Sequence, residues 1–223
     1  MPRCLLSLSG GLDSAVLCAA LLAEHGSGSV EAVFFRYGST HGPWEARAAR
    51  AVADHLAVPL TPVDLRAVFI HAHSALLAAD GRPLPKADYD RESMSQTVVP
   101  GRNLIFAATL ASMAESRSIP LVALATHAGD HSLYPDCHPS FNAALAQVIR
   151  ESSGAAVSVI TPFAAMTKAD IVAKGAALNV PFALTRSCYE RTRQSCGQCG
   201  TCRERLQAFA ANRLEDPVTY RKR

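Results

Sequence analysis

Short apolar runs alternate with longer alanine- and leucine-rich runs along most of this 223-residue chain, and no other feature constrains the fold as much. The short runs have the length of buried strands, and the longer runs have helical periodicity. We expect strands at residues 3–9, 29–38, 59–65, 119–127 and 156–162. We expect helices at residues 14–26, 43–58, 101–117, 141–152 and 167–178. This order predicts an α/β, Rossmann-like fold with a mostly parallel sheet covered by helices on both faces.

Local signals support several of these helix ends. Gly26 predicts the end of the first helix, and Pro43 suits the first turn of the second. Thr167 and Asp170 have the spacing of a capping box, in a helix that Gly175 either interrupts or ends.

The chain contains no internal repeat and no low-complexity linker. Residues 66–97 lack a regular pattern, so a long loop is expected there. We therefore expect one nucleotide-binding domain over residues 1–185, with a cysteine-rich segment at 186–223 packed on it.

Residues 7–14, "SLSGGLDS", lie where the first expected strand meets the first expected helix. Open parallel sheets bind ligands at the carboxyl ends of their strands, often at a helix N-terminus. The paired glycines would allow positive φ and a close approach of backbone N–H groups, while Ser9 and Ser14 offer hydroxyl donors. The loop predicts a polyphosphate site, and Asp13 within it implies a mediating Mg²⁺. The alternative is a glycine turn with Asp13 or Ser14 as N-cap.

Four of the seven cysteines fall close together near the end of the chain, at Cys188, Cys196, Cys199 and Cys202. Successive C-x-x-C spacings with one further cysteine are typical of a Cys₄ metal site. We expect one structural Zn²⁺, because four thiolates leave no open position for catalysis. A 4Fe–4S cluster is the alternative.

Residues around these cysteines would support the metal. Two glycines would turn the backbone tightly and donate N–H groups to sulfur, and four arginines would offset the thiolate charge. These residues are Gly197, Gly200, Arg191, Arg193, Arg203 and Arg205.

Composition excludes several classes of protein. A formal net charge of +3, with 18% charged residues, is too small to indicate nucleic-acid binding on electrostatics alone. Asp13 and the paired glycines interrupt an N-terminal run that otherwise mimics a signal peptide, and no other stretch has the length of a membrane span. We expect a cytoplasmic protein. A zinc-ribbon nucleic-acid-binding protein is the non-enzyme alternative.

The string S-G-G-x-D-S resembles the PP-loop of the ATP pyrophosphatases, a superfamily with the adenine nucleotide α-hydrolase-like fold. Three further stretches, "VPGRNLIFAATLA", "HAGDHSLYPDCHPSF" and "SCY" with "CGQCGTC", resemble the QueC-like family of 7-cyano-7-deazaguanine (preQ0) synthases. The resemblance extends along essentially the whole chain. It implies a ligase that uses ATP and ammonia to convert 7-carboxy-7-deazaguanine into the nitrile through an acyl-adenylate and an amide, with release of AMP and pyrophosphate.

The resemblance also implies residue roles. It places ATP at Leu8, Ser9, Gly10, Gly11, Asp13, Ser14, Gly101, Arg102 and Asn103. It gives catalytic roles to Asp13, Arg102 and Lys168, although Lys168 could equally be a solvated surface lysine. The heterocycle is assigned to Asp130, Tyr134 and Asp136, with Asp136 as first choice, because a carboxylate matches an N1–H and NH₂ edge. Phe35 and Tyr37 either face the purine or belong to the core.

Some features leave the reading open. Thr40, Leu133 and His138 depart from the family strings, so a relative that stops at the amide, or couples the acid to another amine, is an alternative. A sulfur-inserting tRNA enzyme with the same loop is a further rival. His41, His127, His131 and His138 are read as scattered loop histidines rather than a second metal site. A homodimer or a pathway partner protein stays open, and direct nucleic-acid binding is not expected.

Overall fold

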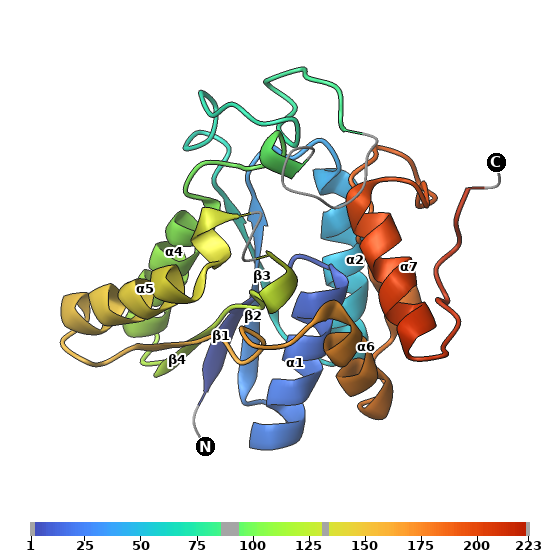
Figure 1. Cartoon of the computed structure of the whole chain (residues 1–223). Helices are drawn as coiled ribbons and strands as arrows, with labels where there is room; N and C mark the ends of the chain where they lie inside the picture. The colour runs from blue at the N-terminus through green and yellow to red at the C-terminus, as the bar shows by residue number, and fades with distance from the viewer. Residues whose placement is uncertain (1–2, 86–93, 131–133, 222–223) are drawn as a thin grey trace.

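The computed structural model describes residues 3–85, 94–130 and 134–221, and its centre is a five-stranded parallel sheet (Figure 1). The strand order is β3-β2-β1-β4-β5, and every neighbouring pair is parallel. The strands are β1 (Cys4–Ser7), β2 (Val30–Arg36), β3 (Leu60–Asp64), β4 (Leu121–Ala123) and β5 (Ser158–Ile160). All five expected strands are present, each shorter than its apolar run, and the predicted fold class is confirmed.

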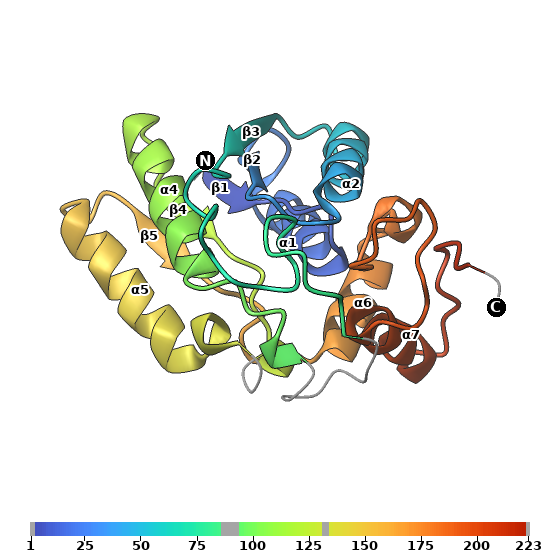
Figure 2. The same ribbon diagram turned by 90° about the horizontal axis from the view of Figure 1, so that it is seen from above.

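Helices cover both faces of this sheet (Figure 2). Side chains alternate across a strand, so Leu6 of β1 packs in one buried cluster and its neighbour Leu5 in another. The first cluster joins the sheet to α1 (Leu12–His25), α2 (Gly42–His55) and α6 (Lys168–Ala177). The second joins it to α4 (Arg102–Ser116) and α5 (Pro139–Ser152). A strand buried on both faces needs the continuous apolar run that the sequence contains.

The predicted helix signals are found at the helix ends. Gly26 terminates α1 at φ 89° and donates its N–H to Leu22, and Pro43 lies in the first turn of α2. Thr167 and Asp170 form the complete capping box of α6. Gly175 lies inside α6, where a Cβ would come within 2.6 Å of Val16, so the glycine permits close packing against α1.

Two helices begin two residues earlier than predicted. α1 starts at Leu12 rather than Ser14, with the backbone of Gly11 as N-cap and no side-chain cap. The N-cap alternative for Asp13 or Ser14 is therefore wrong, since both lie in the first helical turn. α5 starts at Pro139 because the His138 ring accepts a hydrogen bond from the Ser140 N–H.

The C-terminal segment adds a helix that periodicity did not predict, α7 (Gly200–Ala211). Ala208 and Phe209 of α7 join the same buried cluster as α1 and α6. Short 3₁₀ turns η1 (Ala128–Asp130), η2 (Pro135–Cys137) and η3 (Phe182–Leu184) complete the chain. The described parts of the expected loop, residues 66–85 and 94–97, are mostly turns and irregular chain, with an isolated β-bridge at Leu77 and helical backbone only at 94–95. No helix in the described ranges is long and apolar enough to cross a membrane.

Candidate active site

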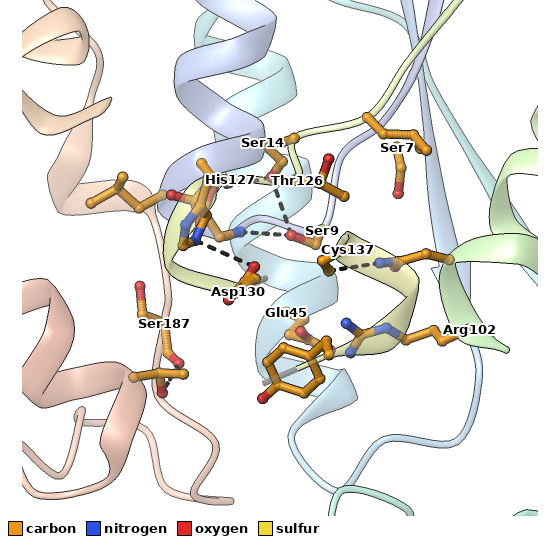
Figure 3. Close-up of a pocket in the computed structure, with 18 of the residues that line it drawn as sticks. Ser7, Ser9, Ser14, Glu45, Arg102, Thr126, His127, Asp130, Cys137 and Ser187 are labelled. Atoms are coloured by element: carbon orange, nitrogen blue, oxygen red, sulfur yellow. Dashed lines mark hydrogen bonds and ion pairs between the residues drawn. The ribbon is translucent and has the colours of Figure 1, made fainter. Parts of the chain in front are cut away.

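A cavity of about 220 Å³ opens where β1 and β4 end, beside the N-termini of α1 and α4. Residues from distant parts of the chain converge on it: Arg102 enters from α4 and Ser187 from the C-terminal segment, with Ser9 and Ser14 between them (Figure 3). The predicted site residues that line it are Ser9, Gly11, Asp13, Ser14, Arg102, Asn103, Asp130, Tyr134 and Lys168. This is the place that the topology of an open parallel sheet reserves for a ligand.

The loop after β1 is held in one conformation by its own hydroxyls. Gly11 N donates to Ser9 Oγ at 3.2 Å, and the Ser9 and Ser14 hydroxyls lie 3.1 Å apart. The first turn of α1 follows directly and leaves its N-terminal N–H groups without partners in the helix. Those donors and the helix dipole make the end of α1 an anion site.

The two glycines of the loop have different roles. Gly10 has φ 79°, and a Cβ there would lie 2.4 Å from the backbone nitrogen of Ala49, so α2 packs directly on it. Gly11 has φ −73°, an ordinary value for any residue. Of the paired glycines, both of which allow positive φ, only Gly10 adopts it.

Three predicted ATP residues and one predicted substrate residue do not line the cavity. Leu8 is fully buried in the core, Gly10 faces α2, and Gly101 takes a left-handed conformation (φ 65°) as the N-cap of α4. The carboxylate of Asp136 accepts from Asn103 N at 2.9 Å and so closes the start of α4.

Lys168 joins three helices through its ammonium group. Its Nζ lies 2.7 and 2.9 Å from the Asp13 carboxylate oxygens and 3.3 Å from Glu204 Oε2. Burial alone would raise the pKa of Asp13, but the Lys168 ammonium and His127 outweigh it, and the pKa lies below its ordinary value. Burial likewise opposes the charge of Lys168, while Asp13 and Glu204 hold its pKa above the ordinary value. Lys168 is thus a partly buried cation at the loop, not a solvated surface lysine.

Arg102 of α4 brings a second positive charge to the cavity (Figure 3). Its guanidinium carbon lies 6.0 Å from the centre of the Tyr37 ring, and Tyr189, Asp136 and Cys137 also face it. Asn103 donates to the Asp136 carbonyl at 3.0 Å and to Cys137 Sγ at 3.2 Å, which ties α4 to η2.

The other two residues predicted to bind the substrate, Tyr134 and Asp130, both line the cavity. Tyr134 is buried and shares a 2.9 Å hydrogen bond with the Thr97 hydroxyl. Asp130 lies 3.4 Å from Nε2 of the buried His127. Phe35 lines the cavity while stacking on Phe106 at 4.3 Å, so it is both a core residue and a wall residue.

Sequence reasoning missed several wall residues, above all Glu45 and Glu204. Glu45 accepts from the Ser39 hydroxyl at 2.9 Å and lies 3.3 Å from the buried His41. Burial opposes its charge, but His41 and Ser39 lower the pKa of Glu45 below its ordinary value. The four-residue spacing between His41 and Glu45 gave no usable signal, because Glu45 and Glu204 both look like surface positions of an amphipathic helix. Other unpredicted wall residues are Ser7, Thr126, Arg186, Ser187, Tyr189 and Thr201.

The two departures from the family strings that the structure describes, Thr40 and His138, do not line the cavity. Thr40 donates its N–H to the Leu76 carbonyl, and its hydroxyl lies 3.3 Å from the His41 ring. His138 is exposed at the start of α5. Neither residue lines the cavity. His131 and Leu133 lie outside the described residues.

The four clustered cysteines lie close enough together that they could hold one metal ion. Their sulfur atoms all lie within 4.8 Å of one another, and the side chains are buried. A tetrahedral Zn²⁺ with bonds of 2.3 Å would separate its sulfurs by about 3.8 Å, so the cluster fits such an ion with small adjustments. In a 4Fe–4S cluster each thiolate binds a different iron, which requires more widely spaced sulfurs than one shared ion.

Backbone N–H groups point at these sulfurs, although not from the predicted glycines. Glu190 and Cys196 donate to Cys188 Sγ, while Gln198 and Cys199 donate to Cys196 Sγ, all at 3.3–3.4 Å. Gly197 does turn the chain at φ 70°, whereas Gly200 begins α7.

The predicted charge compensation by Arg205 is wrong. Its guanidinium is buried and bound to the Asp216 carboxylate at 2.8 and 2.9 Å, with a further hydrogen bond to the Thr185 hydroxyl. A buried guanidinium needs a carboxylate and further hydrogen-bond acceptors. Arg205 therefore anchors α7 to the segment that follows it.

Comparison with known proteins agrees with this geometry. A model of the family described as queuosine biosynthesis protein QueC matches residues 3–213. A 7-cyano-7-deazaguanine synthase of Brucella ovis is 39% identical over 220 residues, covering 98% of this chain and 93% of that protein. One of Rhizobium rhizogenes is 40% identical over 214 residues, covering 95% and 89%.

Solved structures share the fold. An NMN synthetase from Francisella tularensis has a TM-score of 0.54 at 14% identity and covers 96% of this chain and 78% of that one. The U34-tRNA thiolase NcsA from Methanococcus maripaludis, solved with its 4Fe–4S cluster, has a TM-score of 0.51 at 12% identity, covering 94% and 65%. At these identities the likeness is one of fold.

Proposed function

The chain belongs to the family of the queuosine biosynthesis protein QueC, and from this premise we propose that it is a 7-cyano-7-deazaguanine synthase. It converts 7-carboxy-7-deazaguanine and ammonia to the nitrile at the expense of two ATP. The observation that carries the proposal is the convergence of the S-G-G-x-D-S loop, Arg102 and Lys168 on one cavity.

The reaction activates the same carbon twice. A carboxylate oxygen of the substrate attacks the α-phosphorus of ATP, which gives the acyl-adenylate and pyrophosphate. Ammonia then attacks the acyl carbon, AMP leaves, and the amide forms with loss of a proton. The amide oxygen attacks the α-phosphorus of a second ATP and releases pyrophosphate, and elimination of AMP with loss of both amide protons leaves the nitrile. Orientation and charge stabilisation at the α-phosphate are the tasks left to the protein.

The ATP loop suits the pyrophosphate end of the nucleotide. Ser9, Gly11 and Ser14 lie with the N-terminus of α1, where donors and the helix dipole favour an anion. Lys168 adds a cation from α6. Leu8, Gly10 and Gly101 act indirectly, because they fix the loop in the core, against α2 and at the start of α4.

Asp13 is the residue that would hold Mg²⁺. Carboxylate oxygens are the ligands that this ion prefers, and the Asp13 carboxylate faces the cavity beside Lys168. The ion would neutralise charge on the polyphosphate. The Lys168 ammonium is free to bind a phosphate oxygen once Asp13 has a second cation.

The substrate is assigned to the side of the cavity bounded by Arg102. A guanidinium is suited to the carboxylate at position 7 and to the developing charge on its adenylate. Asp130 and Tyr134 are the wall residues proposed for the heterocycle. Asp136, which binds the start of α4, is proposed to position Asn103 and Arg102 rather than to read the ring.

The four cysteines are proposed to hold one structural Zn²⁺. Support comes from the close spacing of the sulfurs and from the burial of all four side chains, which leaves no open coordination position. When bound, the ion would fix the first turn of α7 and the loop before it. A reduced thiol site and the use of ATP suit an enzyme of the cytoplasm.

A product assay tests the proposal. The protein is mixed with Mg·ATP, ammonium and 7-carboxy-7-deazaguanine, and the products are identified by mass spectrometry. We expect the nitrile, with two AMP and two pyrophosphate for each acid consumed. Accumulation of the amide alone would contradict nitrile synthesis, and ADP with phosphate would contradict adenylation. Neither Thr40 nor His138 lines the cavity, so neither gives reason to expect a halt at the amide.

A further inference from the structure

Glu204 is a partly buried carboxylate that no step of the reaction above uses. It lies in α7, two residues after Cys202, yet its side chain reaches the cavity wall and keeps only 15% of its surface exposed. Its Oε2 atom lies 3.3 Å from Lys168 Nζ, while the Asp13 carboxylate holds the same nitrogen at 2.7 Å. One ammonium is therefore shared by two carboxylates from two different helices.

The residues around Glu204 restrict the position of its carboxylate. A Cβ on Gly129 would lie 3.1 Å from Glu204 Oε1 and 3.0 Å from the His127 ring, so only a glycine leaves the carboxylate its place without a shift of neighbours. The next residue, Arg205, is anchored by Asp216. On the preceding turn, Thr201 donates to the Ser187 carbonyl at 2.8 Å.

We propose that Glu204 is a positioning residue that aims the Lys168 ammonium at the leaving pyrophosphate, and that the four-cysteine segment serves the reaction through it. This inference rests on the proposed function. Asp13 alone would leave the ammonium free to rotate about one ion pair, and the second carboxylate restricts it to one direction. A catalytic group held to within about half an ångström is what such a site needs.

The negative charge of Glu204 and its anchoring of Lys168 are expected to have opposite effects on the kinetics with ATP. An experiment can therefore separate the two roles. The Glu204→Gln variant removes a negative charge from an anion site, so affinity for ATP should not weaken. It also removes one of two anchors of Lys168, so stabilisation of the leaving pyrophosphate should fall. We expect kcat to drop about tenfold with the KM for ATP unchanged or lower, since transition-state stabilisation is lost and ground-state binding is not.

A double-mutant cycle shows whether Glu204 acts through Lys168. In the Lys168→Met background, Glu204→Gln should change kcat less than about twofold, because the group that it positions is gone. Glu204→Asp keeps the charge but withdraws it by one methylene, and should recover part of the rate. Glu190→Gln is the matched control: this carboxylate lies in the same segment, pairs with Arg221 at 3.5 Å and is not on the cavity wall.

An activity-independent readout completes the test. The sequence has only four lysines, so the ammonium resonances of ¹⁵N-lysine-labelled protein can be assigned with Lys168→Met. A buried, ion-paired ammonium exchanges slowly, and we expect the Lys168 signal in the wild type and Glu190→Gln but its shift or loss in Glu204→Gln. Metal content equal to the wild type confirms that each variant is folded at the cysteine cluster.

The outcomes are distinguishable. An unchanged Lys168 resonance in Glu204→Gln, a raised KM with unchanged kcat, or equal effects of Glu204→Gln in both backgrounds would overturn the positioning role. A wild type that makes no nitrile would overturn the proposed function. In that case the resonance still decides whether Glu204 holds Lys168.

Discussion

The Asp136 carboxylate accepts a hydrogen bond from the backbone N–H of Asn103 at 2.9 Å, which closes the start of α4 from a turn thirty-three residues away. A charged acceptor at a helix N-terminus stabilises both the unpaired N–H group and the helix dipole. Asp136 therefore orders the end of the helix that carries Arg102.

Replacing Asp136 by alanine should lower the free energy of unfolding by about 1–2 kcal/mol, because α4 loses its charged acceptor. The KM for the deazaguanine acid should rise more than the KM for ATP, since Arg102 is displaced. Urea unfolding and steady-state kinetics measure the two effects. Asp54→Ala removes an exposed acid from an ion pair with Arg50 and should change neither. Equal stability of the two variants would contradict this role of Asp136.

Gly10→Ala should destabilise the protein far more than Gly28→Ala. The two glycines have nearly the same φ, 79° and 78°, so the backbone strain of an alanine is matched at about 1–2 kcal/mol. At Gly28 a Cβ meets nothing within 4 Å, whereas at Gly10 it would collide with the backbone of α2. We expect a further loss of about 2 kcal/mol or more for Gly10→Ala in urea unfolding. Similar losses for both variants would mean that α2 does not pack on the loop.

The sequence was sufficient for the fold and for the position of the loop after β1, because their signals are local. Strands buried on both faces need continuous apolar runs, and the capping box of α6 is written in Thr167 and Asp170. The loop string and the cysteine spacing likewise depend on neighbours in sequence. Element ends were less accurate, since α1 is capped by the backbone of Gly11 rather than by a side chain.

The missing part of the site depends on tertiary packing. Glu204 reaches Lys168 only because α7 docks beside α6, and nothing in "CRERL" distinguishes this acid from a surface residue. Asp136 has the residue type of a substrate ligand, but the fold places the start of α4 against it. The role of Gly10 in admitting α2 depends on a helix more than thirty residues away. Such contacts cannot be read from local pattern.

Replacing Lys168 by methionine should make the free energy of unfolding depend on pH in a range where the wild-type ion pair of Asp13 and Lys168 does not titrate. In the wild type the pKa of Asp13 lies below 3.8 and that of Lys168 above 10.5, so the ion pair is intact between about pH 5 and pH 9. Without the ammonium, burial raises the pKa of Asp13, and the variant should lose stability as pH rises through that value. We expect the deficit at pH 8 to reach about 2 kcal/mol, since Asp13 keeps a quarter of its side chain exposed.

Urea unfolding at several pH values measures this deficit. Glu204 and His127 also face Asp13, so the control is the Asp13→Asn change added to Lys168→Met, which should remove the part of the extra pH dependence that belongs to Asp13. The part that stays belongs to Glu204, because burial raises its pKa and Lys168 lowers it. A deficit that is constant with pH would contradict the assignment to Asp13.

The purified protein should contain one zinc and no iron per chain, and Cys196→Ser should lose the metal. The serine hydroxyl is a poor replacement for a thiolate, and the remaining three sulfurs leave the ion open to chelators. Elemental analysis measures the content. Cys18→Ala changes a buried cysteine of α1 outside the cluster and should keep the zinc. Iron at full occupancy, or zinc retained by Cys196→Ser, would contradict the Cys₄ assignment.

The fate of the two substrate oxygens tests the central claim most directly. With both carboxylate oxygens of 7-carboxy-7-deazaguanine labelled with ¹⁸O, each activation transfers one labelled oxygen to the α-phosphate. Mass spectrometry should find two AMP molecules per nitrile, each with one ¹⁸O, and no label in pyrophosphate. Label in inorganic phosphate or in released water, or unlabelled AMP, would contradict activation by adenylation at this loop.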